Sequence, residues 1–280
     1  MKTVGILHHL GLGDFIDCNG LVRLILKNSE YEKIYIISKE NYFDMISYMY
    51  EDQPLIEVLP IKNLTKDWQI KLREAFLLMN DVPAEFSEHL YQGTFGSAVS
   101  SREIFLAKSK LQEKNVDDIL IIGFQNFDWT AVNNDNKNCW EVFYDQLQIP
   151  YKVRKDYYEM KRNNEEEFRV LEKLNPLKEP FAFVHDDKER GFVIEPEHVD
   201  SKLKIIKNDP TENVFHFAKI IEEAEEIHCM ESVYKSLVDV LNPNGKLYFH
   251  DFRGHPLGEE GEKKWKVITY EQKLGHYSQS

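Results

Sequence analysis

A glycine turn near the N-terminus constrains the fold of this chain more than any other feature. An apolar run at 3–7 is followed by two histidines and then by Gly-Leu-Gly-Asp at positions 11–14. Large apolar residues then recur at helical spacing as far as residue 25. Gly11 and Gly13 allow the backbone to turn sharply and a ligand to approach it closely. The stretch therefore predicts a strand, a tight turn and a helix, with Asp14 at or near the N-terminus of that helix.

Asp14 has two interpretations in this position. A carboxylate there is either a cap for the helix or a base held at the carboxyl end of a strand, where open α/β sheets bind their ligands. A dinucleotide-binding turn is the weaker hypothesis, because it requires a third glycine where Ile16 stands. It also requires an acidic residue after the second strand, where the chain has Lys39.

Strand-like and helical segments alternate along the first half of the chain. After the first strand, the strand-like segments are 33–38, 55–59 and 118–122, and the helical ones are 42–50, 68–79, 101–114 and 139–147. Such alternation predicts a parallel sheet covered by helices on both faces. An irregular, asparagine-rich stretch at 123–138 interrupts the pattern.

The second half of the chain begins the same alternation again. The expected strands are 181–185, 203–206, 226–230 and 246–250, and the expected helices are 214–224 and 231–241. A charged stretch and two prolines come before the first of these strands, so we place a domain boundary between about 150 and 180.

We therefore predict an α/β protein of two Rossmann-like α/β/α domains. Its expected parts are an N-terminal domain at 1–150, a charged helical linker at 151–178, a C-terminal domain at 179–260 and a tail at 261–280. The tail has two interpretations: a helix that packs back on the first domain, or a segment that is disordered towards its end.

Charge and composition argue against several classes of protein. The 280-residue chain has a net charge of −13, which disfavours long-range attraction to nucleic acid or to an anionic membrane. No segment approaches the ~20 apolar residues of a membrane span, and no signal peptide is evident, so a soluble, cytoplasmic protein is expected. The three cysteines are widely spaced and the ten histidines form no HxxxH or HExxH pattern, so neither a disulfide framework nor a metal site is expected.

Three short motifs, taken in order, resemble those of one enzyme family. They are the Gly-Leu-Gly-Asp turn, a charged turn at 185–191 and a Glu-Ser junction at 231–232. The resemblance is to heptosyltransferase-like glycosyltransferases of the two-Rossmann (GT-B) type. It implies two domains facing across a cleft, with the nucleotide-sugar bound mainly by the C-terminal domain and the acceptor by the N-terminal one. Asp14 matches the aspartate that serves in that family as the base on the acceptor hydroxyl.

The junction between the strand at 226–230 and the following helix resembles the family's nucleotide-sugar-binding turn. Glu231 falls on an aspartate of the family and Ser232 on its threonine, whereas Val233 and Ser236 depart from its usual glycine and histidine. Free backbone amides at a helix N-terminus favour a diphosphate, and Glu231 can bond a ribose hydroxyl. The plain alternative is that Ser232 is an ordinary N-cap.

Two further segments complete the expected donor site. In the charged turn, Arg190 can hold phosphate oxygens with two hydrogen bonds, and Lys188 adds a positive charge that helps the diphosphate to leave. By the same resemblance, an apolar side chain, Phe215 or Val214, is expected beneath the nucleotide base. Gly11 and Gly13 are expected to let the nucleotide-sugar approach the backbone.

The acceptor is expected at the first domain. His9 lies next to the glycine turn, and Asp17 is one helical turn after Asp14, where it is a second candidate base. Phe127 and Trp129, in the irregular stretch, offer aromatic faces on which a sugar can stack. A structural histidine and an ordinary surface loop are the plain alternatives.

Together these features predict a glycosyltransferase that moves a sugar from a nucleoside-diphosphate sugar to a hydroxyl of a glycan or saccharide. A UDP-sugar is favoured, with a GDP-sugar next. Inversion at the anomeric carbon is expected, and no metal or other cofactor is expected. The alternatives are a nucleotide-sugar epimerase or hydrolase of the same architecture, and a nucleotide-binding protein without catalytic activity.

Overall fold

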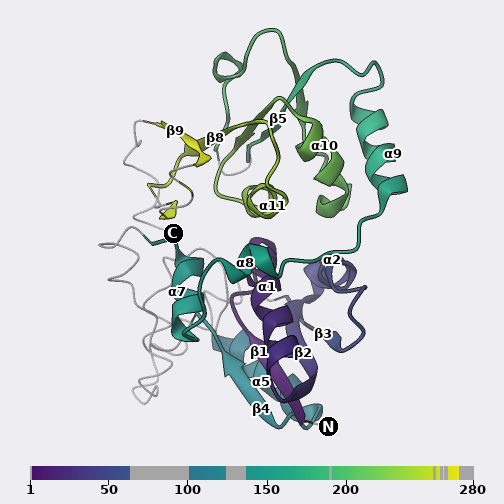
Figure 1. The fold of residues 1–280 in the computed structure, drawn as a ribbon, viewed down its shortest axis with the longest axis vertical. Helices are drawn as coiled ribbons and strands as arrows, with labels where there is room; N and C mark the ends of the chain where they lie inside the picture. The colour runs from purple at the N-terminus through teal and green to yellow at the C-terminus, as the bar shows by residue number, and fades with distance from the viewer. Residues whose placement is uncertain are drawn as a thin grey trace. The chain divides into compact units, whose positions relative to one another are not determined.

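The chain forms two compact units, each built on a parallel β-sheet (Figure 1). The computed structural model describes residues 2–63, 101–123, 137–188 and 191–270, apart from residues 255, 256, 259, 260, 262 and 263. One unit contains Met1–Asp128 and Val142–Lys161, and the other contains Trp129–Glu141 and Arg162–Ser280. The predicted α/β fold of two Rossmann-like units is confirmed.

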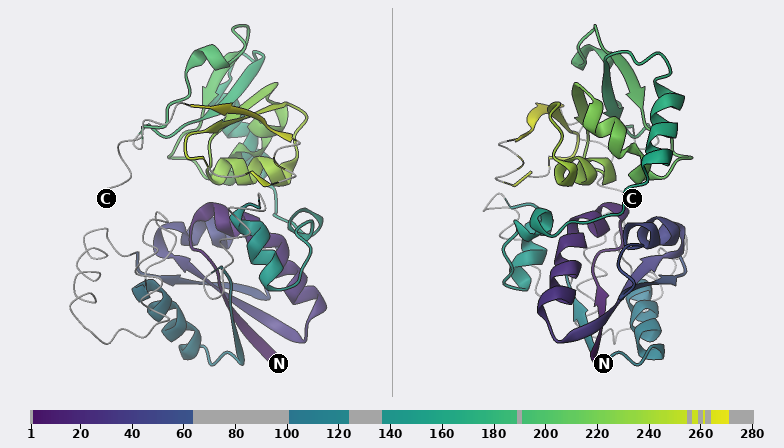
Figure 2. Two further views of the ribbon diagram at one scale, coloured as in Figure 1. Left: turned by 90° about the vertical axis from the view of Figure 1, so that its left-hand side faces the viewer. Right: turned by 45° about the vertical axis from the view of Figure 1, so that its right-hand side comes forward.

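The described residues of the first unit include four parallel strands in the order β3-β2-β1-β4. They are β1 (Lys2–Leu7), β2 (Tyr31–Lys39), β3 (Ile56–Ile61) and β4 (Asp118–Ile121). Val4, Ile6 and Leu7 of β1 are fully buried. Figure 2 shows why, since α1 (Leu12–Asn28) and α5 (Ser101–Glu113) lie on opposite faces of the sheet. A strand covered on both faces is apolar along its whole length, which is the pattern read from the sequence.

Shorter elements complete the first unit. They are η1 (Glu40–Tyr42), α2 (Phe43–Met49), α8 (Val153–Asp156) and α7 (Cys139–Gln146), whose first residues are assigned to the second unit. β3 continues through Pro60, where the sequence predicts its end. Among the described strands β3 lies at the edge of the sheet, and a strand at an edge tolerates proline.

In the second unit, the described residues form five parallel strands in the order β6-β5-β7-β8-β9. They are β5 (Phe181–His185), β6 (Lys204–Lys207), β7 (Glu226–Cys229), β8 (Lys246–Asp251) and β9 (Lys266–Thr269). Its helical segments are α9 (Asn164–Leu174), η2 (Pro196–His198), η3 (Val214–Phe217), α10 (Ala218–Glu223) and α11 (Val233–Leu241). The Phe183 ring of β5 lies 5.9 Å from Phe217 and 5.4 Å from Tyr234, so one aromatic cluster joins the sheet to η3 and α11.

Two segments differ from the sequence-based expectation. Residues 266–269 form β9, parallel to β8, rather than part of a helix, and their β-branched side chains favour an extended backbone. Residues 151–178 do not form one linker: α8 packs on α1 in the first unit, and α9 packs on α10 in the second. Within the described residues, no helix combines the length and the hydropathy needed to cross a membrane.

A row of polar side chains crosses β7 and β8 on one face of the second sheet. His228 Nδ1 lies 3.0 Å from His250 Nε2, and His228 Nε2 lies 3.4 Å from a Glu226 carboxylate oxygen. At the other end, His250 Nδ1 lies 2.6 Å from the hydroxyl of Tyr270. Both imidazoles are fully buried, and this burial lowers the pKa of His228 and lowers that of His250 to about 3. The native second unit therefore holds two neutral histidines.

We expect the second unit to lose stability as the pH falls. An imidazole with a lowered pKa in the folded state stabilises folding fully above its unfolded pKa of about 6.5, and this contribution is lost as the pH falls towards the folded value. The midpoint of thermal unfolding, measured between about pH 7.5 and pH 4.5, should therefore fall. In the His250→Gln variant, the midpoint of thermal unfolding should fall less steeply over the same pH range. An identical pH dependence in the variant would mean that His250 takes up no proton on unfolding.

Candidate functional site

Asp14 lies at the start of α1, at the carboxyl end of β1. Gly11 is the N-cap of the helix and Asp14 is its third residue, and the Asp14 Oδ2 accepts a hydrogen bond of 3.1 Å from the Gly11 N–H. The backbone of Gly11 has φ −77, which any residue adopts. A Cβ at this position would lie 2.7 Å from the Asp14 Oδ2, so a larger residue would displace the carboxylate from its present position. Gly13, the second helical residue, has an ordinary helical backbone.

The two histidines before the turn have different environments. His8 is buried, donates from Nδ1 to the carbonyl of His9 at 2.5 Å, and has its pKa lowered to about 4 by desolvation. Its Nε2 has no hydrogen-bond partner in the described part of the chain. His9 is half-buried, with Nε2 2.8 Å from the carbonyl oxygen of Gly123 and its ring edge-on to Phe143. His9 therefore links the end of β1 to the end of β4.

Asp17 is fully buried within the first unit. Its carboxylate forms an ion pair with the Arg154 guanidinium of α8, and that side chain is 3% exposed. The two helices approach closely, since a Cβ on Gly20 would lie 2.4 Å from the carbonyl oxygen of Val153. Tyr144 also donates its hydroxyl proton to the backbone oxygen of Asp17. The structure gives Asp17 a packing role, and we leave it out of the proposed acceptor site.

The carboxyl ends of the strands in the second unit gather a set of polar side chains. His185, at the end of β5, lies with Nδ1 2.8 Å from the Asn208 side-chain oxygen and its ring 4.5 Å from that of Tyr234. Next to them, Lys207 at the end of β6 donates to the Asp186 carboxylate at 2.5 Å. The polar atoms of His185, Asn208, Lys207 and Asp186 therefore already have hydrogen-bond partners within this set.

The charged turn after β5 is a narrow hairpin. Asp187 and Phe192 exchange two backbone hydrogen bonds of 2.8 Å, and Gly191 has φ +77, a conformation that favours glycine. Lys188 is exposed in this turn. Arg190, together with Phe127 and Trp129 of the expected acceptor site, lies outside the described residues.

The Glu-Ser junction opens α11, as the sequence predicts. Ser232 is the N-cap residue, but its hydroxyl donates to the carbonyl of Met230 at 3.1 Å and makes no side-chain capping bond. Glu231 pairs with Arg253, whose Nη1 lies 3.2 Å from the Glu231 Oε2. Phe215 is fully buried in the core of the second unit, in contact with no surface, so a role beneath a nucleotide base is not part of the site described here.

Arg253 is a residue that the sequence-based reasoning missed. It follows β8 directly, and its position after a strand was the only signal in the sequence. The structure thus brings Asp14, Gly11, Gly13 and His9 together in the first unit. It brings Glu231, Ser232 and Arg253 together in the second.

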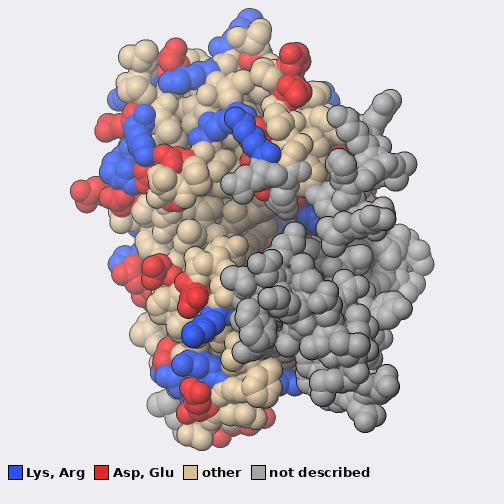
Figure 3. Space-filling model, turned by 180° about the vertical axis from the view of Figure 1, so that it is seen from behind, with Lys and Arg blue, Asp and Glu red and all other residues tan. Residues whose placement is uncertain are grey.

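On the face shown in Figure 3, positive and negative side chains are interspersed over the described residues. Among the described residues, no group of three or more His, Cys, Asp and Glu side chains is arranged to hold a metal ion. Binding of an anion therefore depends on a few local cations and backbone amides.

Comparisons with known proteins identify the fold. No protein-family model and no curated protein matches the sequence. The crystal structure of a family 9 glycosyl transferase from Veillonella parvula DSM 2008 is similar, with a TM-score of 0.53, 10% sequence identity, and coverage of 96% of this chain and 86% of that chain. This likeness shows that the chain shares the two-Rossmann (GT-B) fold of that protein.

Two other solved structures show weaker likeness. The ADP-heptose LPS heptosyltransferase II of E. coli matches with a TM-score of 0.47 and 11% identity, over 96% of this chain and 90% of that chain. The MnaA protein of S. aureus, in a co-structure with UDP, matches with a TM-score of 0.42 and 12% identity, over 96% of this chain and 84% of that chain.

We expect Arg154→Met to destabilise the first unit by about 3–5 kcal/mol, because it leaves the Asp17 carboxylate buried without a counter-charge. The free energy of unfolding, measured by chemical denaturation, checks this. Arg169→Met is the matched control, because Arg169 is 46% exposed where it pairs with Glu212, and the loss of an exposed ion pair should change the free energy of unfolding much less.

The double variant Asp17→Leu/Arg154→Met should recover most of the lost stability, since both charges are then absent. A single variant as stable as the wild type would contradict the structural role given to this ion pair.

Proposed function

We propose that this protein is a glycosyltransferase that moves a sugar from a nucleoside-diphosphate sugar to a hydroxyl group of a glycan or saccharide acceptor. The GT-B fold of the chain is the coarse support for this class of activity. A UDP-sugar is the favoured donor, with a GDP-sugar next. The acceptor is bound by the first unit and the donor by the second.

The position of Asp14 carries the proposal. Its carboxylate lies at the carboxyl end of β1, at the edge of the sheet where open α/β folds bind ligands. One oxygen is fixed by the Gly11 N–H, so the side chain is oriented before any substrate arrives. A base must lie within about 3 Å of the proton that it removes, directly or through one water, and a fixed carboxylate meets that need without reorganisation.

The proposed reaction is a direct displacement. Asp14 takes the proton of the acceptor hydroxyl as the hydroxyl oxygen forms a bond to the anomeric carbon. The bond between that carbon and the diphosphate oxygen breaks, and the electron pair leaves with the diphosphate. Attack from the face opposite the leaving group inverts the configuration of the anomeric carbon.

The second unit supplies the groups proposed to hold the leaving diphosphate. The backbone amides at the start of α11, next to Glu231 and Ser232, and the positive charge of Lys188 and Arg190 would stabilise the developing negative charge. No metal ion is part of this proposal, since these groups provide the charge compensation.

We expect UDP or GDP to raise the midpoint of thermal unfolding, and NAD to leave it unchanged. A ligand at 100 times its dissociation constant adds about 2.7 kcal/mol of stability to the folded state. A thermal-shift screen against UDP, GDP, CMP and NAD measures this. A shift with NAD alone, or with none of the four, would overturn the proposed donor class.

We expect Asp14→Asn to abolish transfer while leaving the fold intact. The amide oxygen can still accept from the Gly11 N–H, so the unfolding midpoint should stay close to that of the wild type. Because an amide cannot act as a base, the rate of transfer should fall by about 10²- to 10⁴-fold. The measurement is sugar transfer from the donor that the screen selects, alongside its binding.

Asp44→Asn is the matched control for this experiment. Asp44 is also an aspartate in the first turn of a helix of the first unit, and its side chain is exposed. Its amide variant should transfer sugar at the wild-type rate. Full activity in Asp14→Asn would remove Asp14 from the role of base, whereas equal losses in both variants would point to a general effect on the fold.

A further inference from the structure

Arg253 is held by a tight turn at the carboxyl end of β8. The Asp251 Oδ1 accepts hydrogen bonds from the backbone N–H groups of Arg253, at 3.1 Å, and Gly254, at 2.6 Å. Gly254 has φ +68, so the turn uses a conformation that glycine adopts at low cost. The backbone of Arg253 is therefore fixed before its side chain meets a ligand.

The guanidinium group of Arg253 is only partly used by the protein. Its Nη1 lies 3.2 Å from the Glu231 Oε2, and the two side chains are 30% and 25% exposed. Within the described residues, this ion pair is the one interaction of the guanidinium, and it lacks the geometry of a hydrogen bond. Arginine presents five N–H donors in a planar fork that matches phosphate oxygens, so most of its binding capacity is available.

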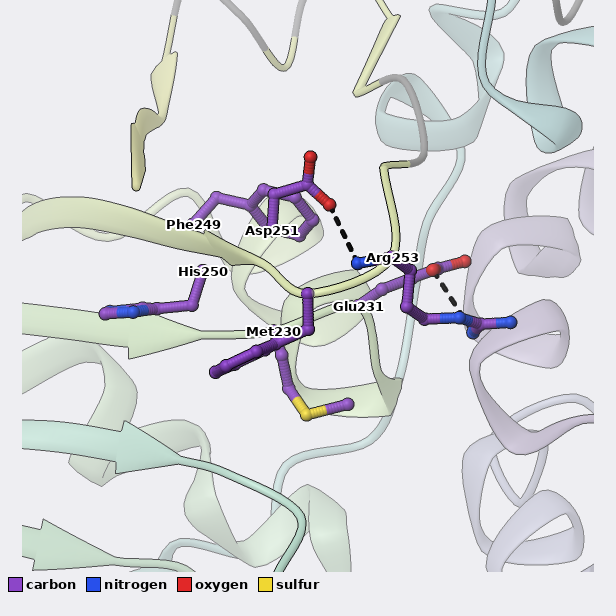
Figure 4. Close-up of a pocket in the computed structure, with 7 residues that line it drawn as sticks. Met230, Glu231, Phe249, His250, Asp251 and Arg253 are labelled. Atoms are coloured by element: carbon purple, nitrogen blue, oxygen red, sulfur yellow. Dashed lines mark hydrogen bonds and ion pairs between the residues drawn. The ribbon is translucent and has the colours of Figure 1, made fainter. Parts of the chain in front are cut away.

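The pair lines a shallow depression at the edge of the second sheet (Figure 4). The depression is formed by residues 230–231, between β7 and α11, and by residues 249–253, at and just after the end of β8. Figure 4 shows the side chains of Glu231 and Arg253 extending together, away from His250. The ion pair therefore lies at the surface, where a ligand can reach it.

The charge balance of this edge requires a cation at this place. Glu231 stands next to the amides of α11, and a lone carboxylate there would repel a diphosphate. Lys207, at the end of β6 two strands away from β7, is already bound to Asp186. Arg253 neutralises Glu231, and its remaining N–H groups stay available to an anion.

We propose that Arg253 binds the diphosphate of the nucleotide-sugar, with Glu231 holding the guanidinium group in position. This inference rests on the proposed function and adds to it a phosphate-binding residue. In this proposal Glu231 acts on the diphosphate indirectly, by orienting Arg253, and this role is additional to a hydrogen bond with the ribose.

Arg253→Gln tests the proposal, with UDP, GDP and ADP as probes and the phosphate-free nucleosides uridine, guanosine and adenosine as their partners. Isothermal titration on the full chain should show about 10- to 100-fold weaker binding of the diphosphate that the wild type prefers, because charge-assisted hydrogen bonds to phosphate are lost. Binding of the matching nucleoside should be unchanged. Arg253→Lys should recover part of the loss, since it restores the charge without the planar fork.

Lys246→Gln is the matched control. Lys246 lies at the opposite end of the same strand, and its Nζ is also 3.2 Å from a glutamate oxygen, that of Glu226. This variant removes the same charge from the same unit and should bind the diphosphate as the wild type does. Thermal unfolding of each variant shows whether it is folded.

The outcomes separate the two proposals. A folded Arg253→Gln variant that binds the diphosphate as tightly as the wild type overturns the role of Arg253 and leaves the proposed function standing. An equal loss in Lys246→Gln overturns it as well, because the effect would then be one of net charge. A wild-type protein that binds none of the three diphosphates overturns the proposed function, and this inference with it.

Discussion

Burial of both faces of a parallel sheet is the constraint on which the rest of this structure depends. In the first unit α1 and α5 cover opposite faces of the sheet, and in the second unit η3 and α11 cover one face while Ile194 and Val199 pack on the other. Few polar groups can stay unpaired in such cores. The strand ends are then the places where polar groups can meet a ligand. Asp14 follows β1 and Arg253 follows β8, so both candidate groups stand where the fold leaves room for chemistry.

Most of the fold could be predicted because buried parallel strands leave a strong local signal. Apolar runs such as 34–37 and 181–184 are visible without any knowledge of their partners. Features that depend on position in the sheet could not be predicted in this way. Pro60 marks a strand end by its local preference, yet β3 continues through it because β3 lies at an edge. β9 is a short segment with β-branched residues, and it forms a strand because its backbone can pair with that of β8.

The candidate site was predictable to the extent that its signals are local. The Gly-Leu-Gly-Asp turn places Asp14 near the start of a helix, and the structure has it there. The reason for Gly11 was not predictable, since it depends on the direction of the Asp14 carboxylate and not on a special backbone angle. The partner of Asp17 lies 137 residues away, and nothing near Asp17 in the sequence indicates Arg154. The candidate role of Arg253 likewise depends on its ion pair with Glu231, which follows a different strand and lies 22 residues earlier in the sequence.

The ion pair between Asp17 and Arg154 has a consequence for how this protein can be divided. α1 carries the candidate base, Asp14, in its first turn. One turn later, Asp17 of the same helix forms an ion pair with Arg154 of the four-residue helix α8, which is far away in the sequence. A fragment cut at residue 150 would keep every strand of the first sheet and lose the guanidinium that neutralises the buried carboxylate of Asp17. A continuous segment that carries the first unit intact must therefore extend to residue 161. Such a segment also includes residues 129–141, which are assigned to the second unit, so the boundary between the units is not a single cut in the chain.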